Sequence, residues 1–263
     1  MNRILTYLLI ILPIILQSCD IINNEDRLIE VAQVAANKTV MIIEFTDQKC
    51  VNCPAASDVI EQLKEEYPDK IISVSVHAYI TNLPLVTATG KSYNTIFQPA
   101  AYVHPAAMID GSENTSIATE EWSNLVRLAV QEEADADLTI TCSYDSISKT
   151  LTAISQIRGV NDDLSNLNLQ LWLTEDSISS YQLMSDGSRN NDYVHNNVFR
   201  AAINGNFGEN FNISPGLIVS DTTTTTISDT SWNIDHLNLV GFIYTGENFN
   251  RIIKTVKTKV LNE

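Results

Sequence analysis

An apolar strand, two cysteines and an amphipathic helix follow one another directly between residues 39 and 67. The run from Thr39 to Thr46 is rich in β-branched residues and is bounded by polar ones, which is typical of a strand buried on both faces. A helix is predicted from Pro54, because proline is favoured in a first helical turn. A second apolar strand is predicted over residues 70–79. Strand, helix and strand at this spacing predict a βαβ unit with two parallel strands.

The cysteines of this segment, Cys50 and Cys53, are candidates for chemistry. The strand delivers Cys50 to the start of the helix, where unpaired amides and the helix dipole stabilise a thiolate, and Lys49 adds a positive charge beside it. Cys53 lies one turn further on and can close a disulfide. A redox-active dithiol, a structural disulfide and a metal site are the three alternatives. Zinc would need two more nitrogen or sulfur ligands, and the 4 histidines form no spaced pair.

The next part of the chain mixes irregular and helical patterns. Residues 80–102 lack clean periodicity and are predicted to be an irregular insert with a short helix towards its end. A short strand is expected to end at Asp110 and Gly111, a dipeptide typical of a hairpin turn. Residues 119–134 begin with acidic side chains and carry apolar residues along one face, which predicts a helix.

From residue 135 onward, apolar and polar residues alternate in short segments that are separated by Asn, Asp, Ser and Gly clusters. Several short strands at this spacing predict an antiparallel β-sandwich. Residues 181–192 are predicted to be a polar loop. His195 and His236, together with His77 near the end of the second strand, are interpreted as structural or surface residues.

The first residues have the pattern of a bacterial lipoprotein signal. Arg3 precedes an apolar stretch from Ile4 to Leu16, which is shorter than the ~20 residues of a membrane-spanning helix. The stretch ends in a sequence that resembles a lipobox, so a signal peptide of residues 1–18 is expected to be cleaved before Cys19. Lipid on Cys19 would then anchor the protein in a membrane. The alternative is an ordinary secretory signal with a chance cysteine, and either interpretation places the mature chain outside the cytoplasm.

Composition excludes one class of partner. The chain has 16 Lys and Arg against 32 Asp and Glu, a formal net charge of −16, and no basic run, so it would repel the phosphate backbone of nucleic acids. The sequence has no phosphate-binding glycine loop and no catalytic triad, and no cofactor is expected. Cys142 lies in an alternating segment and is predicted to be a buried strand residue without chemistry. Nothing in the sequence indicates an oligomeric state.

Residues 40–53 resemble the active-site strand and loop of thioredoxin-fold proteins. That resemblance implies that Glu44 is a buried acid that exchanges protons with Cys53. It also implies a cis-proline that faces the dithiol, and Pro105 stands in the corresponding position. Glu44 could instead hydrogen-bond a neighbour, and His104 could either tune the dithiol or be an exposed loop residue.

Over nearly its full length the chain is similar to the twenty-eight-kilodalton outer-membrane lipoprotein family. The similarity rests on the lipobox, the paired cysteines, a strand with the sequence VFRAAI and a late strand within WNIDHLNLVGFIY. It implies a location at the outer membrane, on the periplasmic or the surface face, and it says little about activity.

Together these patterns predict an α/β thioredoxin-like domain followed by an all-β immunoglobulin-like sandwich domain. The expected segments are a signal peptide (1–18), a tether (19–26), a thioredoxin-like domain with an insert at 80–102 (27–134) and a β-sandwich domain (135–263).

Two functions from different classes fit this organisation. The first is a lipid-anchored thiol–disulfide oxidoreductase that acts on protein thiols or disulfides: one cysteine attacks, the other resolves the mixed disulfide, the acid relays a proton and the proline presents backbone to the bound chain. Its expected site residues are Cys50, Cys53, Glu44 and Pro105, with Lys49 and His104 beside them. The second is a non-catalytic binding or adhesion lipoprotein with a structural disulfide.

Overall fold

The computed structural model describes residues 37–78, 83–97, 103–160 and 164–261. The predicted signal peptide, the lipid site at Cys19 and the tether lie outside the described residues. The described parts of the chain belong to one compact unit.

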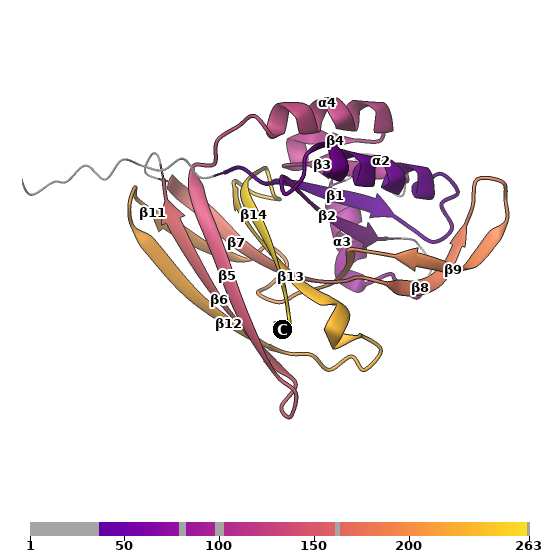
Figure 1. Ribbon diagram of the computed structural model, residues 1–263. Helices are drawn as coiled ribbons and strands as arrows, with labels where there is room; N and C mark the ends of the chain where they lie inside the picture. The colour runs from indigo at the N-terminus through magenta and orange to yellow at the C-terminus, as the bar shows by residue number, and fades with distance from the viewer. Residues whose placement is uncertain (1–36, 79–82, 98–102, 161–163, 262–263) are drawn as a thin grey trace, which may run out of the picture. The chain divides into compact units, whose positions relative to one another are not determined.

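Three α-helices and fourteen strands lie within the described ranges (Figure 1). The helices are α2 (Cys53–Glu66), α3 (Ala88–Phe97) and α4 (Thr119–Ala129). The strands are β1 (Val40–Thr46), β2 (Ile71–His77), β3 (Ala106–Ile109), β4 (Thr115–Ser116), β5 (Ala136–Asp145), β6 (Thr150–Gly159), β7 (Leu164–Glu175), β8 (Ile178–Leu183), β9 (Arg189–His195), β10 (Val198–Ala202), β11 (Glu209–Ile213), β12 (Ile218–Thr226), β13 (Leu237–Thr245) and β14 (Arg251–Lys259).

The predicted β1–α2–β2 unit is confirmed. Strands β1 and β2 run parallel along their whole length, and β3 pairs with the other edge of β1 in the antiparallel direction. Every residue of β1 is buried, as its apolar sequence predicts. The short helix expected towards the end of the insert is α3, and the helix expected after residue 119 is α4.

The predicted fold class is wrong, because the described strands do not divide into a thioredoxin-like domain and a separate immunoglobulin-like sandwich. Nine strands form one mixed sheet in the order β14-β13-β7-β10-β2-β1-β3-β4, with β11 attached to β7. The link between the two expected parts is β10, which pairs with β7 on one side and, through Val198 and Ser75, runs parallel to β2 on the other. Strands dominate the described residues, and the three helices found there cover only parts of this sheet. The domain boundary expected between residues 134 and 135 stays a prediction.

Strand β7 gives the physical reason for this correction. Its sequence alternates well enough to suggest one buried and one exposed face, yet every residue from Leu169 to Glu175 is buried. A strand in the middle of a sheet that is covered on both faces has this burial pattern. Alternation predicts strands from sequence, but it does not say which sheet they join or how many layers cover them.

The two faces of the large sheet have different coverings. Helices α2 and α4 pack on one face of β1 and β3, with Ile60 and Trp122 in this layer. The three-stranded sheet β12-β6-β5 packs against β7, β13 and β14. Helix α3 adds Tyr93 and Phe97 to an aromatic cluster that spans β1, β2, β7 and β13. Figure 1 shows α2 and α4 together over β1, and β5, β6 and β12 beside one another below β7.

A buried ion pair connects the start of β1, the end of β3 and strand β14. Lys38 Nζ lies 2.6 Å from Asp110 Oδ2, and the two side chains are 1% and 5% exposed. Lys38 Nζ also donates to the Ile252 carbonyl at 2.7 Å. Burial raises the pKa of Asp110 to about 6, and the Lys38 ammonium opposes that rise. Removal of one partner from such a pair leaves an uncompensated buried charge.

The substitution Lys38→Met therefore lowers the free energy of unfolding at pH 8 by about 3–5 kcal/mol. The loss is smaller at pH 5, because the Asp110 carboxyl then takes up a proton and the uncompensated charge disappears. Urea unfolding at both pH values measures the difference. The matched control is Lys64→Met, which removes a partly exposed ion pair with Glu61 and costs less than about 1 kcal/mol. Equal losses for Lys38→Met at the two pH values would contradict this account.

Candidate functional site

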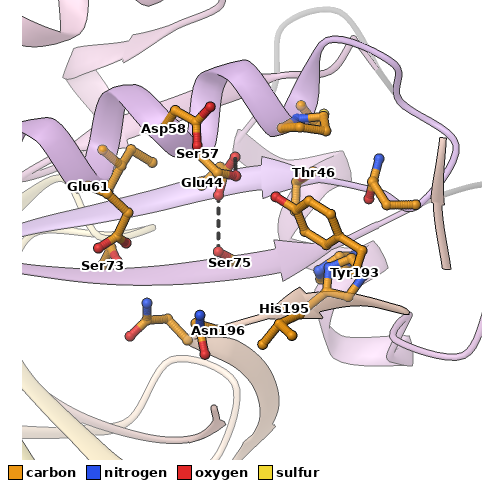
Figure 2. A pocket seen from close by; sticks show the side chains of 17 residues that line it. Glu44, Thr46, Ser57, Asp58, Glu61, Ser73, Ser75, Tyr193, His195 and Asn196 are labelled. Carbon is orange, nitrogen blue, oxygen red and sulfur yellow. Dashed lines mark hydrogen bonds between the residues drawn. The ribbon is translucent and has the colours of Figure 1, made fainter. Parts of the chain in front are cut away.

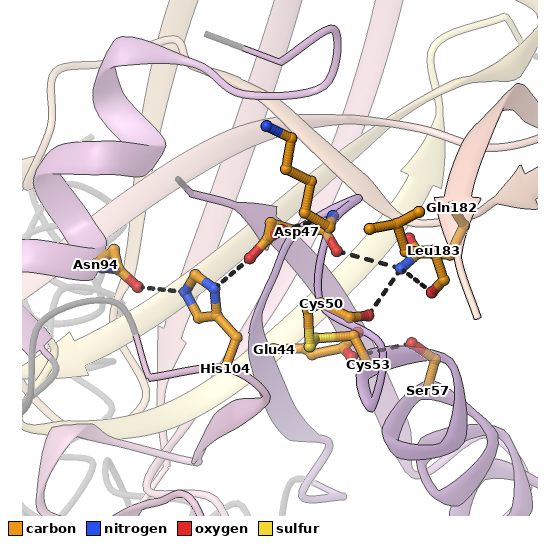
Figure 3. Close-up of a disulfide and its surroundings, with 10 residues drawn as sticks. Glu44, Asp47, Cys50, Cys53, Ser57, Asn94, His104, Gln182 and Leu183 are labelled. Carbon is orange, nitrogen blue, oxygen red and sulfur yellow. Dashed lines mark hydrogen bonds and ion pairs between the residues drawn. A yellow bond between two sulfur atoms is a disulfide. The ribbon is translucent and has the colours of Figure 1, made fainter. Parts of the chain in front are cut away.

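The two cysteines form a disulfide in the turn between β1 and α2. The Cys50 and Cys53 sulfur atoms are bonded, with the two Cα atoms 5.4 Å apart (Figure 3). Cys53 is the first residue of α2 and is 2% exposed, whereas Cys50 lies in the preceding turn and is half-buried. Cys50 is therefore more accessible than Cys53, which is the asymmetry that an exchange reaction through one attacking cysteine requires.

Glu44 is buried beneath α2, on the strand that leads to the disulfide. Its carboxylate accepts hydrogen bonds from Ser57 Oγ of α2 at 2.9 Å and from Ser75 Oγ of β2 at 3.0 Å. Burial raises the pKa of Glu44 to about 7, and the two serine hydroxyls oppose the rise. Near neutral pH this carboxyl is about half protonated, so it can either donate or accept a proton.

A cavity of about 310 Å³ joins Glu44 to Cys53, since both residues line it. Exposed residues such as Glu61 and Asn196 also line the cavity, so it is open to the surface. Figure 2 shows Glu44 and Ser75 on one side of this cavity and His195 of β9 on another. A polar cavity of this size holds water, which gives the buried carboxyl a route for proton exchange with solvent.

Two histidines that were interpreted as structural or surface residues also line this cavity. The rings of His77 and His195 meet edge to face, with centroids 5.2 Å apart. Burial lowers the pKa of both, that of His77 well below its usual range and that of His195 to about 4, so both rings are neutral at pH 7. Among the described residues, neither His77 Nδ1 nor His195 Nε2 has a hydrogen-bond partner.

The predicted residues around Pro105 lie beside the cysteine turn. The peptide bond between His104 and Pro105 is cis, as the sequence resemblance implies. His104 Nδ1 lies 2.7 Å from Asp47 Oδ2, and its Nε2 lies 2.9 Å from Asn94 Oδ1 (Figure 3). Both ring nitrogens of His104 are thus hydrogen-bonded, one to Asp47 and one to Asn94. His104 therefore connects α3 and the loop before β3 to the turn that holds the two cysteines. Its effect on the dithiol stays a prediction, as does the role of Pro105.

Lys49 and Cys142 complete the predicted residues. The Lys49 side chain is exposed, and its backbone amide donates to Asp47 Oδ1 at 2.7 Å. Cys142 lies on β5, is half-buried and takes no part in a disulfide; its thiol donates to the Lys259 carbonyl at 3.0 Å, and burial raises its pKa. In the described ranges no group of three or more His, Cys, Asp or Glu side chains is placed to hold a metal ion.

Sequence reasoning missed the hairpin β8–β9, which it predicted as a polar loop over residues 181–192. Gln182 Nε2 of this hairpin donates to the Cys50 carbonyl at 2.9 Å, and the Leu183 amide donates to the Gln48 carbonyl at 2.9 Å. Gln48 Nε2 returns hydrogen bonds to Ser180 Oγ and to the Tyr181 carbonyl. The hairpin therefore holds the cysteine turn from a segment far along the chain.

A signal for this hairpin was present in the sequence. Asp186 and Gly187 form a dipeptide that is typical of two-stranded hairpin turns, and Gly187 has a φ of 82°, which favours glycine. The many polar side chains around it concealed the strands, because most of β9 is exposed and carries no apolar alternation.

The structure adds one finding on the membrane: no helix in the described part of the chain is both long and apolar enough to cross a bilayer.

Comparisons with known proteins identify relatives of the chain. A profile of the family described as outer membrane protein Omp28 matches residues 91–263. No curated protein matches. Among solved structures, HBP35 of Porphyromonas gingivalis is 15% identical over 86% of this chain and 76% of its own, with a TM-score of 0.68. A protein from Agrobacterium tumefaciens is 11% identical over 88% of this chain and 98% of its own, with a TM-score of 0.55. These two likenesses show a shared fold.

A third solved structure is a domain of the outer membrane lipoprotein Omp28 from Porphyromonas gingivalis. It is 19% identical over 48% of this chain and 88% of its own, and its TM-score of 0.35 is too low to support an argument about fold.

The raised pKa of Glu44 predicts how stability depends on pH. The folded state binds a proton more tightly than the unfolded state, whose carboxyl has the ordinary pKa of 4.5, so this group makes the protein more stable as the pH falls from about 8 to about 5. Glu44→Gln removes the buried charge and should raise the free energy of unfolding at pH 8, by at most about 3 kcal/mol. The gain over wild type should shrink towards zero near about pH 4.

Urea unfolding of the oxidised protein across this pH range measures the effect as the difference between variant and wild type. That difference removes the contributions of Asp110 and the histidines, which both proteins share. Glu61→Gln is the control, because it changes an exposed carboxyl at the same cavity. A difference that did not vary with pH would mean that Glu44 does not titrate in this range.

Proposed function

The chain belongs to the outer membrane protein Omp28 family, and from the geometry around its disulfide we propose that it exchanges disulfides with other proteins outside the cytoplasm, through Cys50 and Cys53. The family predicted from sequence and the outer-membrane location are both confirmed by the match. The match does not bear on exchange activity, which is the proposal made here.

One observation carries the proposal: a half-buried cysteine is bonded to a buried one, and the buried one shares a cavity with a carboxyl whose pKa is raised to about 7. A structural disulfide requires no such group. A buried carboxyl costs stability when it is ionised, and Glu44 lies on an otherwise apolar strand. Strongly shifted ionisable groups in a cavity are typical of functional sites.

The proposed reaction follows from these positions. The reduced protein attacks a partner's disulfide with the Cys50 thiolate, which forms a mixed disulfide and releases one partner thiolate. Glu44 then takes the proton from the Cys53 thiol, and the Cys53 thiolate attacks Cys50, which forms the Cys50–Cys53 disulfide and releases the second partner thiolate. The protons end on the two partner thiols. A protein dithiol that meets the oxidised form runs the same steps in reverse, so the partner's potential sets the direction.

Other groups support the same steps. The amides at the start of α2 face the cysteine turn, and a helix N-terminus favours a thiolate there. Gln182 donates a hydrogen bond to the Cys50 carbonyl and so fixes the backbone of the attacking residue.

A second candidate function is binding without catalysis. It is favoured by the extent of the family match, which begins at residue 91 and so leaves out the disulfide, Glu44 and most of the residues that line the cavity between them. The comparisons thus favour this role over exchange, while the geometry around Cys53 favours exchange. The two roles differ in what happens when the cysteines are removed.

Substitution of the resolving cysteine gives the first test. Cells that produce the full chain with Cys53→Ala should accumulate mixed disulfides between Cys50 and other envelope proteins, because the second attack cannot occur. Acid quenching followed by gels run with and without reductant reveals these adducts. Cys50→Ala is the matched control and should give none, because the remaining thiol is buried. Equal adducts from the two variants, or none from either, would remove the exchange mechanism.

The reduction potential of the disulfide gives the second test. Equilibration of the protein in glutathione buffers, with thiol labelling read by mass, should give a value between about −120 and −270 mV, the range of dithiol catalysts. A potential below about −300 mV would mark a structural disulfide and favour the binding role.

The variant Glu44→Gln should leave the protein folded. It should slow the exchange rate most strongly above neutral pH, where the carboxylate would act as a base.

A further inference from the structure

A second cavity, of about 550 Å³, lies among the ends of β7, β11 and β13. Its lining comes from the first half of β7, from β11 with the turn before it, and from the last residue pair of β13 with the turn that follows. It shares no lining residue with the cavity at the disulfide. It also lies wholly within the part of the chain that the family profile matches.

Amide side chains dominate this groove. Its asparagines are Asn166, Asn168, Asn210 and Asn248. Each amide carries two donor hydrogens and an acceptor oxygen, so the groove offers donors and acceptors side by side. Among the described residues that line it, Glu247 alone carries a charge.

The hydrogen bonds among these amides are long. Asn210 Nδ2 donates to Asn168 Oδ1 at 3.4 Å, and Asn168 Nδ2 donates to the Gly246 carbonyl at 3.3 Å. Such distances exceed the usual range for N–H···O bonds, so these bonds are weak. A ligand hydroxyl at an ordinary hydrogen-bond distance would replace these weak bonds at little cost in free energy. Asn168 and Asn210 are partners in the β7–β11 register, so the backbone holds the two amides next to each other before any ligand arrives.

One aromatic ring forms a rigid side of the groove. Phe207 is half-buried, and its ring centroid lies 5.6 Å from that of Phe249 and 6.2 Å from that of Tyr93. The Phe207 carbonyl accepts a hydrogen bond of 2.6 Å from the Tyr244 hydroxyl. Buried aromatic residues therefore hold the Phe207 side chain in place. The exposed part of Phe207 is available to a ligand.

We propose that this groove binds a neutral saccharide. A sugar ring carries neighbouring hydroxyl groups that each donate and accept, which matches amides that do both. Its C–H bonds form an apolar face that packs on an aromatic ring, as Phe207 offers. The volume lies within the usual range for small-molecule sites, about 300–1,000 Å³.

The charge of the groove argues against other ligands. An anionic ligand, such as a phosphate ester, would meet Glu247 and a chain of net charge −16, with no cationic side chain among the described lining residues. A cation would find only one carboxylate, which is exposed and therefore solvated. An extended peptide would need pockets for alternate side chains, whereas this lining offers two aromatic residues, Phe207 and Tyr244, among amides.

This inference goes beyond disulfide exchange and does not depend on it, because no cysteine takes part. If the exchange function failed its tests, saccharide binding would instead give the binding role a ligand class.

Saturation-transfer NMR tests the proposal with the full-length protein in a detergent that has no sugar headgroup. The probes are four neutral disaccharides, namely maltose, cellobiose, lactose and chitobiose, and the neutral peptide acetyl-Gly-Ser-Asn-Gly-amide. At least one disaccharide should show saturation transfer, with a dissociation constant of about 10 mM or below. No transfer to any of the four, or transfer to the peptide alone, would overturn the proposal.

Matched variants locate the binding. Asn168→Ala and Asn210→Ala each remove an amide from a regular strand of the groove and should weaken sugar binding about tenfold, a difference of about 1.4 kcal/mol. Asn191→Ala removes an exposed amide from β9, outside the groove, and should leave binding unchanged. Phe207 is left intact because it is part of the aromatic cluster. Circular dichroism confirms that each variant is folded. Sugar binding that is equal in all three variants would place the site elsewhere and overturn the proposal.

Discussion

The pairing of β10 with β2 holds the two halves of the described chain in one sheet. It is a short contact, in which the Ser75 amide donates to the Asn197 carbonyl at 2.8 Å and Val198 is the partner of Ser75. The hydroxyl of the same serine binds Glu44. Because β9 leads directly into β10, this contact also brings the β8–β9 hairpin to the cysteine turn. The environment of the disulfide is thus set by strands that come from both halves of the chain.

Two kinds of buried ionisable group occur in the described part of the chain. Lys38 and Asp110 compensate each other, so their burial fastens three strands with little net charge. Glu44 has only two serine hydroxyls for partners, and His77 and His195 each keep a ring nitrogen without one among the described residues. Groups of the second kind cost stability, and proteins retain such groups mainly where they serve a function. Glu44, His77 and His195 all line one cavity, at the inner sulfur of the disulfide.

Local patterns in the sequence predicted local structure well. The β1–α2–β2 unit, α4 and the main alternating strands follow from periodicity, and the spacing of Cys50 and Cys53 allowed for their disulfide. The sheet arrangement was not predictable in the same way, because alternation cannot identify a strand's neighbours. The prediction of residues 181–192 failed for a different reason. The strands of the hairpin face solvent and carry polar side chains, so only Asp186 and Gly187 indicated a hairpin. The asparagine groove depends on turns that converge from three separate strands, which no local pattern can reveal.

The contact between Gln182 and the Cys50 carbonyl joins residues 132 positions apart in the sequence. Contacts between residues so far apart in the sequence form late in folding, because a long loop must close before such contacts stabilise the structure. A chain emerging from its translocation channel therefore presents β1, α2 and both cysteines well before the hairpin exists to hold their turn. During that interval the free edge of β2 can pair with other chains, and the disulfide can close in a turn that is still unsupported. A disulfide between Cys50 and Cys53 can therefore form before the site around it is assembled.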